Sequence, residues 1–241
     1  MNEDKKYQFK QITAEDIRNG GVTLNAVDGE ETKLCMIQDE FRKGMDLVKD
    51  LPSSVTFYGS ARLKEDHPEY IKAYKLAYRL AKELGFVVIT GGGPGIMEAA
   101  NKGANEAGVE SIGLTIRLPH EQYTNPYVTK EASFNFFFTR QVCMSYTTEA
   151  CVFCAGGFGT LNELFEVLTI IQTQKVGKFP VVLYGVEFWT PLADLIKNFL
   201  NDKYKLINEE DQKIFVITDN EDEVLEIIKK SKSRDGSDAL Y

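Results

Sequence analysis

The sequence predicts an α/β protein: a Rossmann-like, doubly wound parallel sheet flanked by helices, in a single domain with an N-terminal helical extension. Short apolar runs alternate with stretches of helical periodicity over most of the chain. The runs are apolar throughout, as strands of a parallel sheet covered on both faces require. Glycine-rich turns follow three of these runs, at residues 59–62, 91–95 and 156–159. Because such turns lie at the carboxyl ends of the strands, we expect them to form a ligand crevice.

The chain is expected to have three parts: an N-terminal extension (residues 1–50), the α/β domain (51–230) and a flexible C-terminal tail (231–241). Apolar residues recur at helical spacing in the extension, at Leu34, Ile37, Phe41, Met45 and Val48. This pattern predicts one amphipathic helix over residues 34–50, ending before Pro52. We expect this helix to pack on the domain or on a second subunit.

Strands and helices are expected to alternate through the domain. The apolar runs predict strands at residues 55–58, 86–90, 111–116, 150–154, 180–184 and 214–218. Helical periodicity predicts helices at residues 70–84, 96–107, 134–148, 161–173, 189–200 and 221–230. Gly85 and Gly108 are expected to end the first two of these helices. Residues 117–133, which include Pro119 and Pro126, are expected to form a long loop.

Composition narrows the classes of partner. The net charge of −8 argues against nucleic acid and against an anionic membrane surface as main partner. No apolar run reaches the roughly 20 residues of a membrane span, and the first ten residues are too polar for a secretory signal. Four cysteines without framework spacing favour a reducing compartment, so we expect a cytoplasmic protein. The two histidines, His67 and His120, are too few for a histidine-rich metal site, and no metal is expected.

The turn at residues 156–159 lies between a predicted strand and a predicted helix. Its glycines Gly156, Gly157 and Gly159 let backbone N–H groups approach a ligand closely. A helix N-terminus adds unpaired donors and partial positive charge, so phosphate is the expected ligand. Thr160 can add a hydroxyl. Glu163 must face something other than the phosphate, and a ribose or a reacting carbon is the natural candidate.

The other two turns supply further candidates. Gly59 and Ser60 follow the first strand, and Gly92 and Gly93 follow the second. Ser60 is a hydrogen-bond donor to a phosphate or ribose rather than a nucleophile, because no motif places a histidine beside it.

Two charged residues remain open between a functional and a structural role. Glu98 is either a substrate ligand or a surface acid that favours the helix dipole. Arg140 is either a surface charge or a buried clamp for a phosphate or base. Cys151 and Cys154 have redox spacing, but within a strand they point to opposite faces, so core packing is expected.

Two nucleotide-binding classes are disfavoured by the glycine turns. The turn at residues 91–95 lacks the third glycine of the dinucleotide fingerprint. No Gly-Lys-Ser/Thr sequence occurs, so the Walker phosphate loop is also absent.

The segments 91–98 and 156–163, together with Arg140, resemble the Lonely Guy (LOG) family of cytokinin riboside 5′-monophosphate phosphoribohydrolases, long labelled "possible lysine decarboxylase". The resemblance covers roughly residues 55–199, and Ala155 stands where the family usually has proline. It implies a nucleotide-binding catalytic domain that hydrolyses a nucleoside 5′-monophosphate, such as AMP or a cytokinin riboside 5′-monophosphate, to free base and ribose 5-phosphate. No cofactor is implied, and a homodimer or a dimer-based hexamer is expected.

The family's catalytic arginine and glutamate correspond to Arg140 and Glu163. The expected substrate-binding residues are Gly59, Ser60, Gly92, Gly93, Glu98, Gly156, Gly157, Gly159 and Thr160. A pyridoxal-dependent decarboxylase is disfavoured, because no lysine lies at a glycine-turn strand end to form the Schiff base. The alternative function is a non-catalytic carrier of a phosphorylated ligand such as molybdenum cofactor, since carriers of that cofactor resemble this fold.

Overall fold

A computed structural model of the 241-residue chain describes residues 30–118, 123–146 and 148–231. The expectations for residues 1–29 and for nearly all of the C-terminal tail therefore lie outside the described residues. The chain divides into two compact units, Met1–Asp39 and Glu40–Tyr241. Helix α2 (Glu30–Val48) begins in the first unit and ends in the second. In the second unit its residue Val48 is fully buried in the core.

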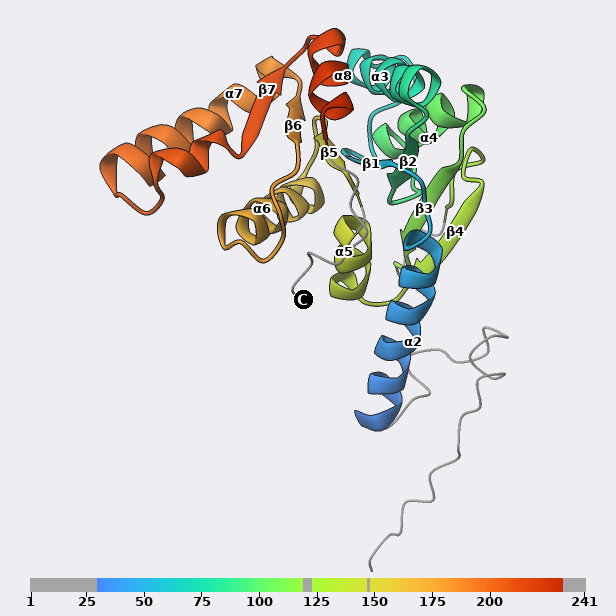
Figure 1. The fold of residues 1–241 in the computed structure, drawn as a ribbon. Helices are drawn as coiled ribbons and strands as arrows, with labels where there is room; N and C mark the ends of the chain where they lie inside the picture. Colours follow the sequence, from blue (N-terminus) through green and yellow to red (C-terminus); the bar gives the residue numbers. More distant parts are fainter. Residues whose placement is uncertain (1–29, 119–122, 147, 232–241) are drawn as a thin grey trace, which may run out of the picture. The chain divides into compact units, whose positions relative to one another are not determined.

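The larger unit is built on a seven-stranded sheet with the order β4-β3-β2-β1-β5-β6-β7, in which every neighbouring pair is parallel (Figure 1). The strands are β1 (Ser54–Tyr58), β2 (Val87–Thr90), β3 (Ser111–Ile116), β4 (Lys130–Phe134), β5 (Ala150–Phe153), β6 (Val181–Tyr184) and β7 (Phe215–Thr218). The chain starts in the middle at β1, winds outward to β4 and returns beside β1 as β5. This confirms the predicted doubly wound α/β fold and puts its switch point between β1 and β5.

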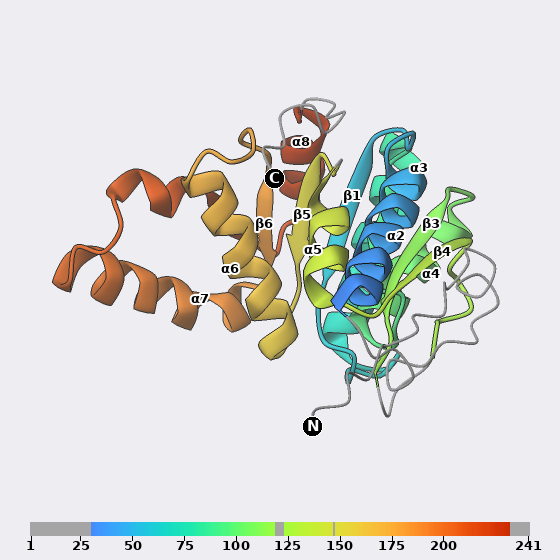
Figure 2. The ribbon, with the colours of Figure 1, turned by 90° about the horizontal axis from the view of Figure 1, so that it is seen from below.

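Helices cover both faces of the sheet (Figures 1 and 2). One core joins the sheet to α3 (Pro68–Leu84), α4 (Ile96–Glu106) and α8 (Glu221–Lys229). The other joins it to α5 (Phe137–Tyr146), α6 (Phe158–Gln172), α7 (Val186–Leu195) and the last residues of α2. Cys154 lies in the first core and Cys151 in the second, which confirms that they point to opposite faces. The remaining helical segments are the π-helix η2 (Ile196–Lys203) and the 3₁₀ helix η3 (Glu209–Lys213).

The expected loop at residues 117–133 was wrong at its end, because β4 forms there. Of the five residues of β4 only Phe134 is buried, and the strand begins with Lys130 and Glu131. It lies at the edge of the sheet that the described residues form, a position where charged residues are common. An edge strand of this kind lacks the continuous apolar run that identified the buried strands.

Two helix starts also differ from the sequence prediction. Helix α6 begins at Phe158 instead of residue 161, so Gly159 and Thr160 belong to its first turn. Helix α5 begins at Phe137 instead of residue 134. Glycine weakens a helix pattern in the sequence, but at a helix start it is tolerated because the first N–H groups have no intrahelical partner. Gly85 ends α3 with φ of 73°, as predicted. Within the described part of the chain, no helix is long and apolar enough to cross a membrane.

Candidate active site

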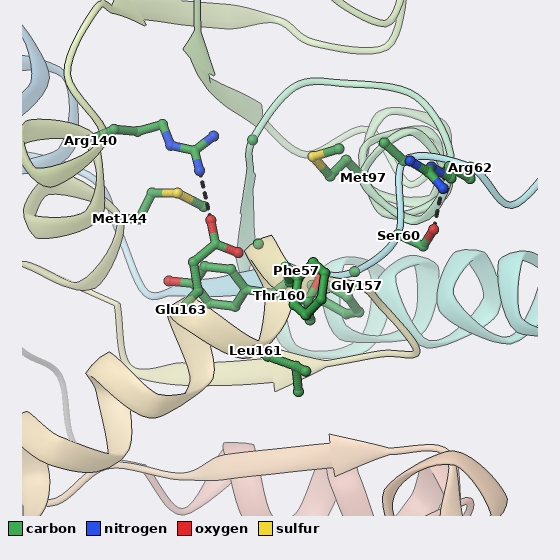
Figure 3. Close-up of a pocket in the computed structure, with 16 residues that line it drawn as sticks. Phe57, Ser60, Arg62, Met97, Arg140, Met144, Gly157, Thr160, Leu161 and Glu163 are labelled. Carbon is green, nitrogen blue, oxygen red and sulfur yellow. Dashed lines mark hydrogen bonds and ion pairs between the residues drawn. The ribbon is translucent and has the colours of Figure 1, made fainter. Parts of the chain in front are cut away.

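The turns after β1, β2 and β5 meet at one edge of the sheet, because these three strands are neighbours in the order β2-β1-β5. A cavity of about 640 Å³ opens between them (Figure 3). Its lining includes Gly59, Ser60, Arg62, Gly91, Met97, Arg140, Met144, Gly157, Gly159, Thr160 and Glu163. It lies at the topological switch point, which is where open α/β sheets bind ligands.

The first turn of α6 forms one wall of this cavity. Gly157 is the N-cap residue, and the helix then runs through Gly159 and Thr160. A Cβ atom at Gly157 or Gly159 would meet no protein atom within 4 Å, so packing within the chain does not require these glycines. No group in the described residues hydrogen-bonds to the Thr160 hydroxyl, which lines the cavity. The amides of this first turn and the hydroxyl can together bind an anion.

Gly156 has a different surrounding from the two glycines that follow it. A Cβ atom there would collide with the Thr160 side chain, and Gly156 is not among the residues that line the cavity. The structure thus gives Gly156 a packing role beside Thr160. Its expected contact with substrate stays a prediction.

A buried ion pair closes the floor of the cavity. Arg140 Nη2 donates to Glu163 Oε1 at 2.7 Å, and the two side chains are 9% and 13% exposed. Figure 3 shows the two side chains pointing toward one another from α5 and α6. The Arg140 guanidinium carbon also lies 5.6 Å from the centre of the Phe137 ring. Its Nε is buried and has no hydrogen-bond partner in the described residues. The clamp interpretation of Arg140 therefore agrees with its burial, and the surface interpretation does not.

Burial sets the protonation of Glu163. It raises the pKa of this carboxyl to about 7, although Arg140 lowers the pKa and Glu166 raises it further. A carboxyl group with a pKa near 7 exchanges a proton readily at neutral pH, which is what a general acid or base needs. Strongly raised pKa values in a cavity are typical of functional sites.

The backbone of Ser60 connects the three turns by hydrogen bonds. Its N–H donates to the Ala155 carbonyl at 3.0 Å, and its carbonyl accepts from the Ile96 N–H at 2.9 Å. Its hydroxyl accepts from the Arg62 N–H at 3.1 Å and keeps its own proton free to donate. Gly59 is needed at this turn for packing, since a Cβ atom there would collide with Ile96. Both Gly59 and Ser60 line the cavity.

The remaining predicted residues follow β2 and lie further from the first cavity. Gly92 has a φ of 70° and packs against Thr115, and it lines neither this cavity nor its neighbour. Glu98 also lines neither; its Oε1 accepts from the Tyr70 hydroxyl at 3.4 Å. Burial raises the pKa of Glu98. Gly93 lines the neighbouring cavity.

That neighbouring cavity has a volume of about 800 Å³ and shares Ala61, Gly91, Met97 and Arg140 with the first. Its far side is formed by residues that follow or belong to β3 and β4. These are Thr115, Ile116, Arg117, Leu118, Tyr123, Thr124, Glu131 and Ser133. Glu131 accepts hydrogen bonds from the Thr115 hydroxyl at 2.7 Å and the Thr124 hydroxyl at 3.2 Å.

Arg62, Met97 and Glu131 line the cavities but were not predicted from the sequence as site residues. Arg62 could have been found, since it closes the first glycine turn. Glu131 could not, because its strand was read as a loop. Across residues 30–118, 123–146 and 148–231, no group of three or more His, Cys, Asp or Glu side chains could hold a metal ion.

Comparison with known proteins identifies the family of this chain. A family model described as "Possible lysine decarboxylase" matches residues 97–228. An uncharacterised protein of Archaeoglobus fulgidus is 32% identical over 126 residues, which are 50% of this chain and 81% of that protein. The rice cytokinin riboside 5′-monophosphate phosphoribohydrolase LOG is 29% identical over 147 residues, 58% of this chain and 59% of the rice protein.

A solved molybdenum cofactor binding protein from Rippkaea orientalis shares the fold, with a TM-score of 0.52 and 20% identity over 75% of this chain and 98% of that one. At this identity the likeness concerns the fold alone. The family match covers more than half of the chain and includes Arg140, Glu163 and the first turn of α6. The chain therefore belongs to the family described as "Possible lysine decarboxylase", the LOG family.

Proposed function

We propose that this protein hydrolyses the N-glycosidic bond of nucleoside 5′-monophosphates, such as AMP or a cytokinin riboside 5′-monophosphate. The products are the free base and ribose 5-phosphate. The observation that carries the proposal is the buried Arg140–Glu163 pair, which opens onto the same cavity as the first turn of α6. An acid–base group and an anion site then act on one bound molecule. The family membership supports the same class of reaction.

The phosphate binds at the first turn of α6. The N–H groups of Gly159 and Thr160, the Thr160 hydroxyl and the Ser60 hydroxyl are its donors. The helix dipole favours the negative charge there. The phosphate does not react: its binding energy holds the anomeric carbon in position at the catalytic carboxylate.

Glu163 acts on the sugar. Breaking the N-glycosidic bond builds positive charge on the ring, which an adjacent carboxylate stabilises. As general base, Glu163 takes a proton from the attacking water while the water oxygen bonds to the anomeric carbon. The base leaves with the electron pair of the broken bond and then takes up a proton. Arg140 offsets the negative charge on the leaving base.

The base extends into the second cavity. The two cavities meet at Arg140 and Met97, so a sugar at Glu163 leaves its base on that side. Apolar contacts from Met97 and Ile116 and polar contacts from Glu131 then surround the ring. This placement supports a site that accepts bases larger than adenine, since the second cavity is the more voluminous of the two.

The residues that line these cavities do not support the decarboxylase activity named in the family description. A pyridoxal cofactor needs a lysine to form its Schiff base. Among the residues that the structure describes, no lysine lines either cavity. The shared fold supports the alternative of a non-catalytic carrier, whereas the Arg140–Glu163 pair favours an enzyme.

Incubation of the purified protein with AMP tests the proposal. Chromatography should show adenine and ribose 5-phosphate in equal amounts, and a panel of monophosphates should rank the bases. The Glu163→Gln variant is the control and should release neither product. A carrier would release no base from any monophosphate and would co-purify with a pterin chromophore, and that result would overturn the enzymatic proposal.

The homodimer or dimer-based hexamer expected from the family resemblance is also a proposal. Exposed phenylalanines on α5 and α6 support it: Phe137, Phe138, Phe158 and Phe165. Phe158 is 94% exposed and lines the cavity, so a second copy covering it would complete the site. Light scattering after size-exclusion chromatography tests the assembly. A cytoplasmic location and a role in cytokinin production stay proposals of the same kind.

A further inference from the structure

A buried carboxylate outside both cavities holds the start of the helix that carries Arg140. Glu40, in the part of α2 that belongs to the larger unit, is 5% exposed. Its Oε1 accepts hydrogen bonds from the backbone N–H and the side-chain amide of Asn135, each at 2.7 Å. Its Oε2 accepts from the Phe136 N–H at 3.3 Å and from the Thr139 hydroxyl at 2.7 Å. One side chain thus satisfies four donors just before Arg140.

These four donors surround the N-terminus of α5. The first N–H groups of a helix lack intrahelical acceptors, and a negative charge beside them is stabilising. The Arg140 N–H donates to the Phe136 carbonyl at 3.4 Å, so Arg140 lies in the first turn. Because Glu40 holds both Phe136 and Thr139, any loosening of this turn displaces the adjacent arginine.

We propose that Glu40 is a positioning residue for Arg140: it caps α5 from a different helix and thereby sets where the guanidinium meets Glu163. The inference rests on the function proposed above, which gives Arg140 its role at the leaving base. Glu40 lies outside the segment 97–228 that the family model matches. The N-terminal part of this chain therefore contributes to the geometry of the site without touching the substrate.

The proposal predicts a change in the titration of Glu163. The charged and titratable groups that face Glu163 are Arg140 from α5, Glu166 from its own helix and Tyr58 from β1. Arg140 lowers the pKa of Glu163, and Glu166 raises it. Replacing Glu40 changes none of these groups chemically. A higher pKa of Glu163 in a Glu40 variant would therefore report a displaced Arg140.

Glu149 offers a matched control. It is 3% exposed, and its Oε2 accepts from the Ser54 N–H at 2.5 Å and the Ser54 hydroxyl at 3.3 Å. It precedes β5 and so lies at the amino end of the sheet, opposite the cavities. Glu149→Gln and Glu40→Gln make the same chemical change at equally buried carboxylates that accept backbone N–H groups.

The experiment compares kcat, KM and the pH profile of AMP hydrolysis in wild type, Glu40→Gln, Glu40→Asp and Glu149→Gln. Misplacement of a catalytic group by about an ångström lowers the rate by about 10-fold to 100-fold, so we expect that fall in kcat for Glu40→Gln. Its KM should change by less than about twofold, because the phosphate site is intact. The rising limb of its pH profile should move to higher pH. Glu40→Asp, which keeps the charge, should recover part of kcat, and Glu149→Gln should match wild type.

Equal kcat and pH profiles in the Glu40→Gln and Glu149→Gln variants would overturn the inference. If Glu40→Gln does not fold, Glu40→Asp carries the same test with a smaller loss. If wild type releases no base from any monophosphate, the proposed function fails on its own. The positioning of Arg140 is then judged by ¹³C NMR titration of Glu163, where an unchanged midpoint in the Glu40 variants would refute it.

Discussion

The turns after β2 and β5 look alike in the sequence but use their glycines differently. Each is rich in glycine and each leads into a helix with an acid in its first turns, Glu98 or Glu163. After β5, Gly157 and Gly159 border open space, and Glu163 faces the cavity. After β2, a Cβ atom on Gly95 would collide with the backbone of Ser60, and Glu98 bonds to Tyr70.

The comparison teaches that a glycine-rich turn has two distinct causes. After β2, Gly92 and Gly95 are needed because φ is positive and other parts of the chain approach closely. After β5, Gly157 and Gly159 leave room that the protein itself does not fill, whereas Gly156 packs against Thr160. Only the second kind indicates a ligand.

The largest expected effect is at the two acids. Glu163→Gln should lower kcat for base release by about 1,000-fold or more, because a general base contributes roughly that factor. AMP binding, measured by calorimetry, should stay within about threefold of wild type, because the phosphate site is unchanged. Glu98→Gln should lower kcat by less than about tenfold, since Glu98 lines neither cavity. Equal losses in both variants would remove the distinction between the two turns.

The raised pKa of Glu163 predicts the pH dependence of kcat/KM, which reports ionisations of the free enzyme. Burial raises this pKa to about 7, and the group acts as a carboxylate, so the rate should rise with pH and level off above that value. Between pH 7 and pH 5 kcat/KM should fall by about 50-fold, because the ionised fraction of Glu163 falls from about one half to about 1%. The same raised pKa predicts that the free energy of unfolding changes with pH in the opposite direction to the rate, falling as the pH rises. A carboxyl group with a raised native pKa stabilises the fold most below its unfolded pKa, and this contribution is lost as pH rises through about 7.

Glu163→Gln should therefore flatten the stability profile over that pH window, which urea denaturation at a series of pH values would show. A profile that keeps its slope in the variant would assign the titration to another group.

Alanine at one glycine of each turn should separate stability from binding. Gly95→Ala should destabilise the fold by about 2 kcal/mol, because φ is 71° and the new Cβ atom meets the Ser60 carbonyl. Gly157 has a φ of −97°, and its Cβ position borders open space. Gly157→Ala should therefore change the free energy of unfolding by less than about 1 kcal/mol. AMP affinity should instead fall by about tenfold if the Cβ atom occupies space used by the phosphate. Thermal unfolding and calorimetry measure the two quantities, and a stability loss at Gly157 with unchanged affinity would contradict the argument.

The sequence predicted most of this fold because buried parallel strands have an unmistakable apolar pattern. It failed at β4, where Lys130 and Glu131 lie on an exposed edge and packing gives no pattern to detect. The glycine turns predicted the place of the site. The family resemblance named Arg140 and Glu163 as catalytic residues, but their ion pair was not predicted. Residues 23 positions apart on different helices come together only through tertiary packing. The role of Glu40 could not be predicted from the sequence for the same reason, because its hydrogen-bond partners lie about 95 residues further along the chain.

The smallest predicted effect concerns the hydroxyls of the two turns. Thr90, the last residue of β2, donates to Asn101 Oδ1 at 2.7 Å and accepts from the Gly92 N–H at 2.8 Å. Thr160 makes no hydrogen bond through its hydroxyl in the described residues and lines the cavity. Thr160→Val should therefore leave the free energy of unfolding within about 0.5 kcal/mol of wild type. Affinity for AMP should fall by about tenfold, and affinity for adenosine should change little, because the lost bond goes to the phosphate.

Thr90→Val provides the contrast, since it removes the acceptor of the buried Gly92 N–H. It should cost about 1–3 kcal/mol of stability and weaken AMP and adenosine alike. Competition binding of AMP and adenosine to each variant measures the ratio of the two affinities. An equal loss of affinity for both ligands in Thr160→Val would show that the phosphate does not bind at the first turn of α6. Glu163 would then no longer be expected to face the sugar.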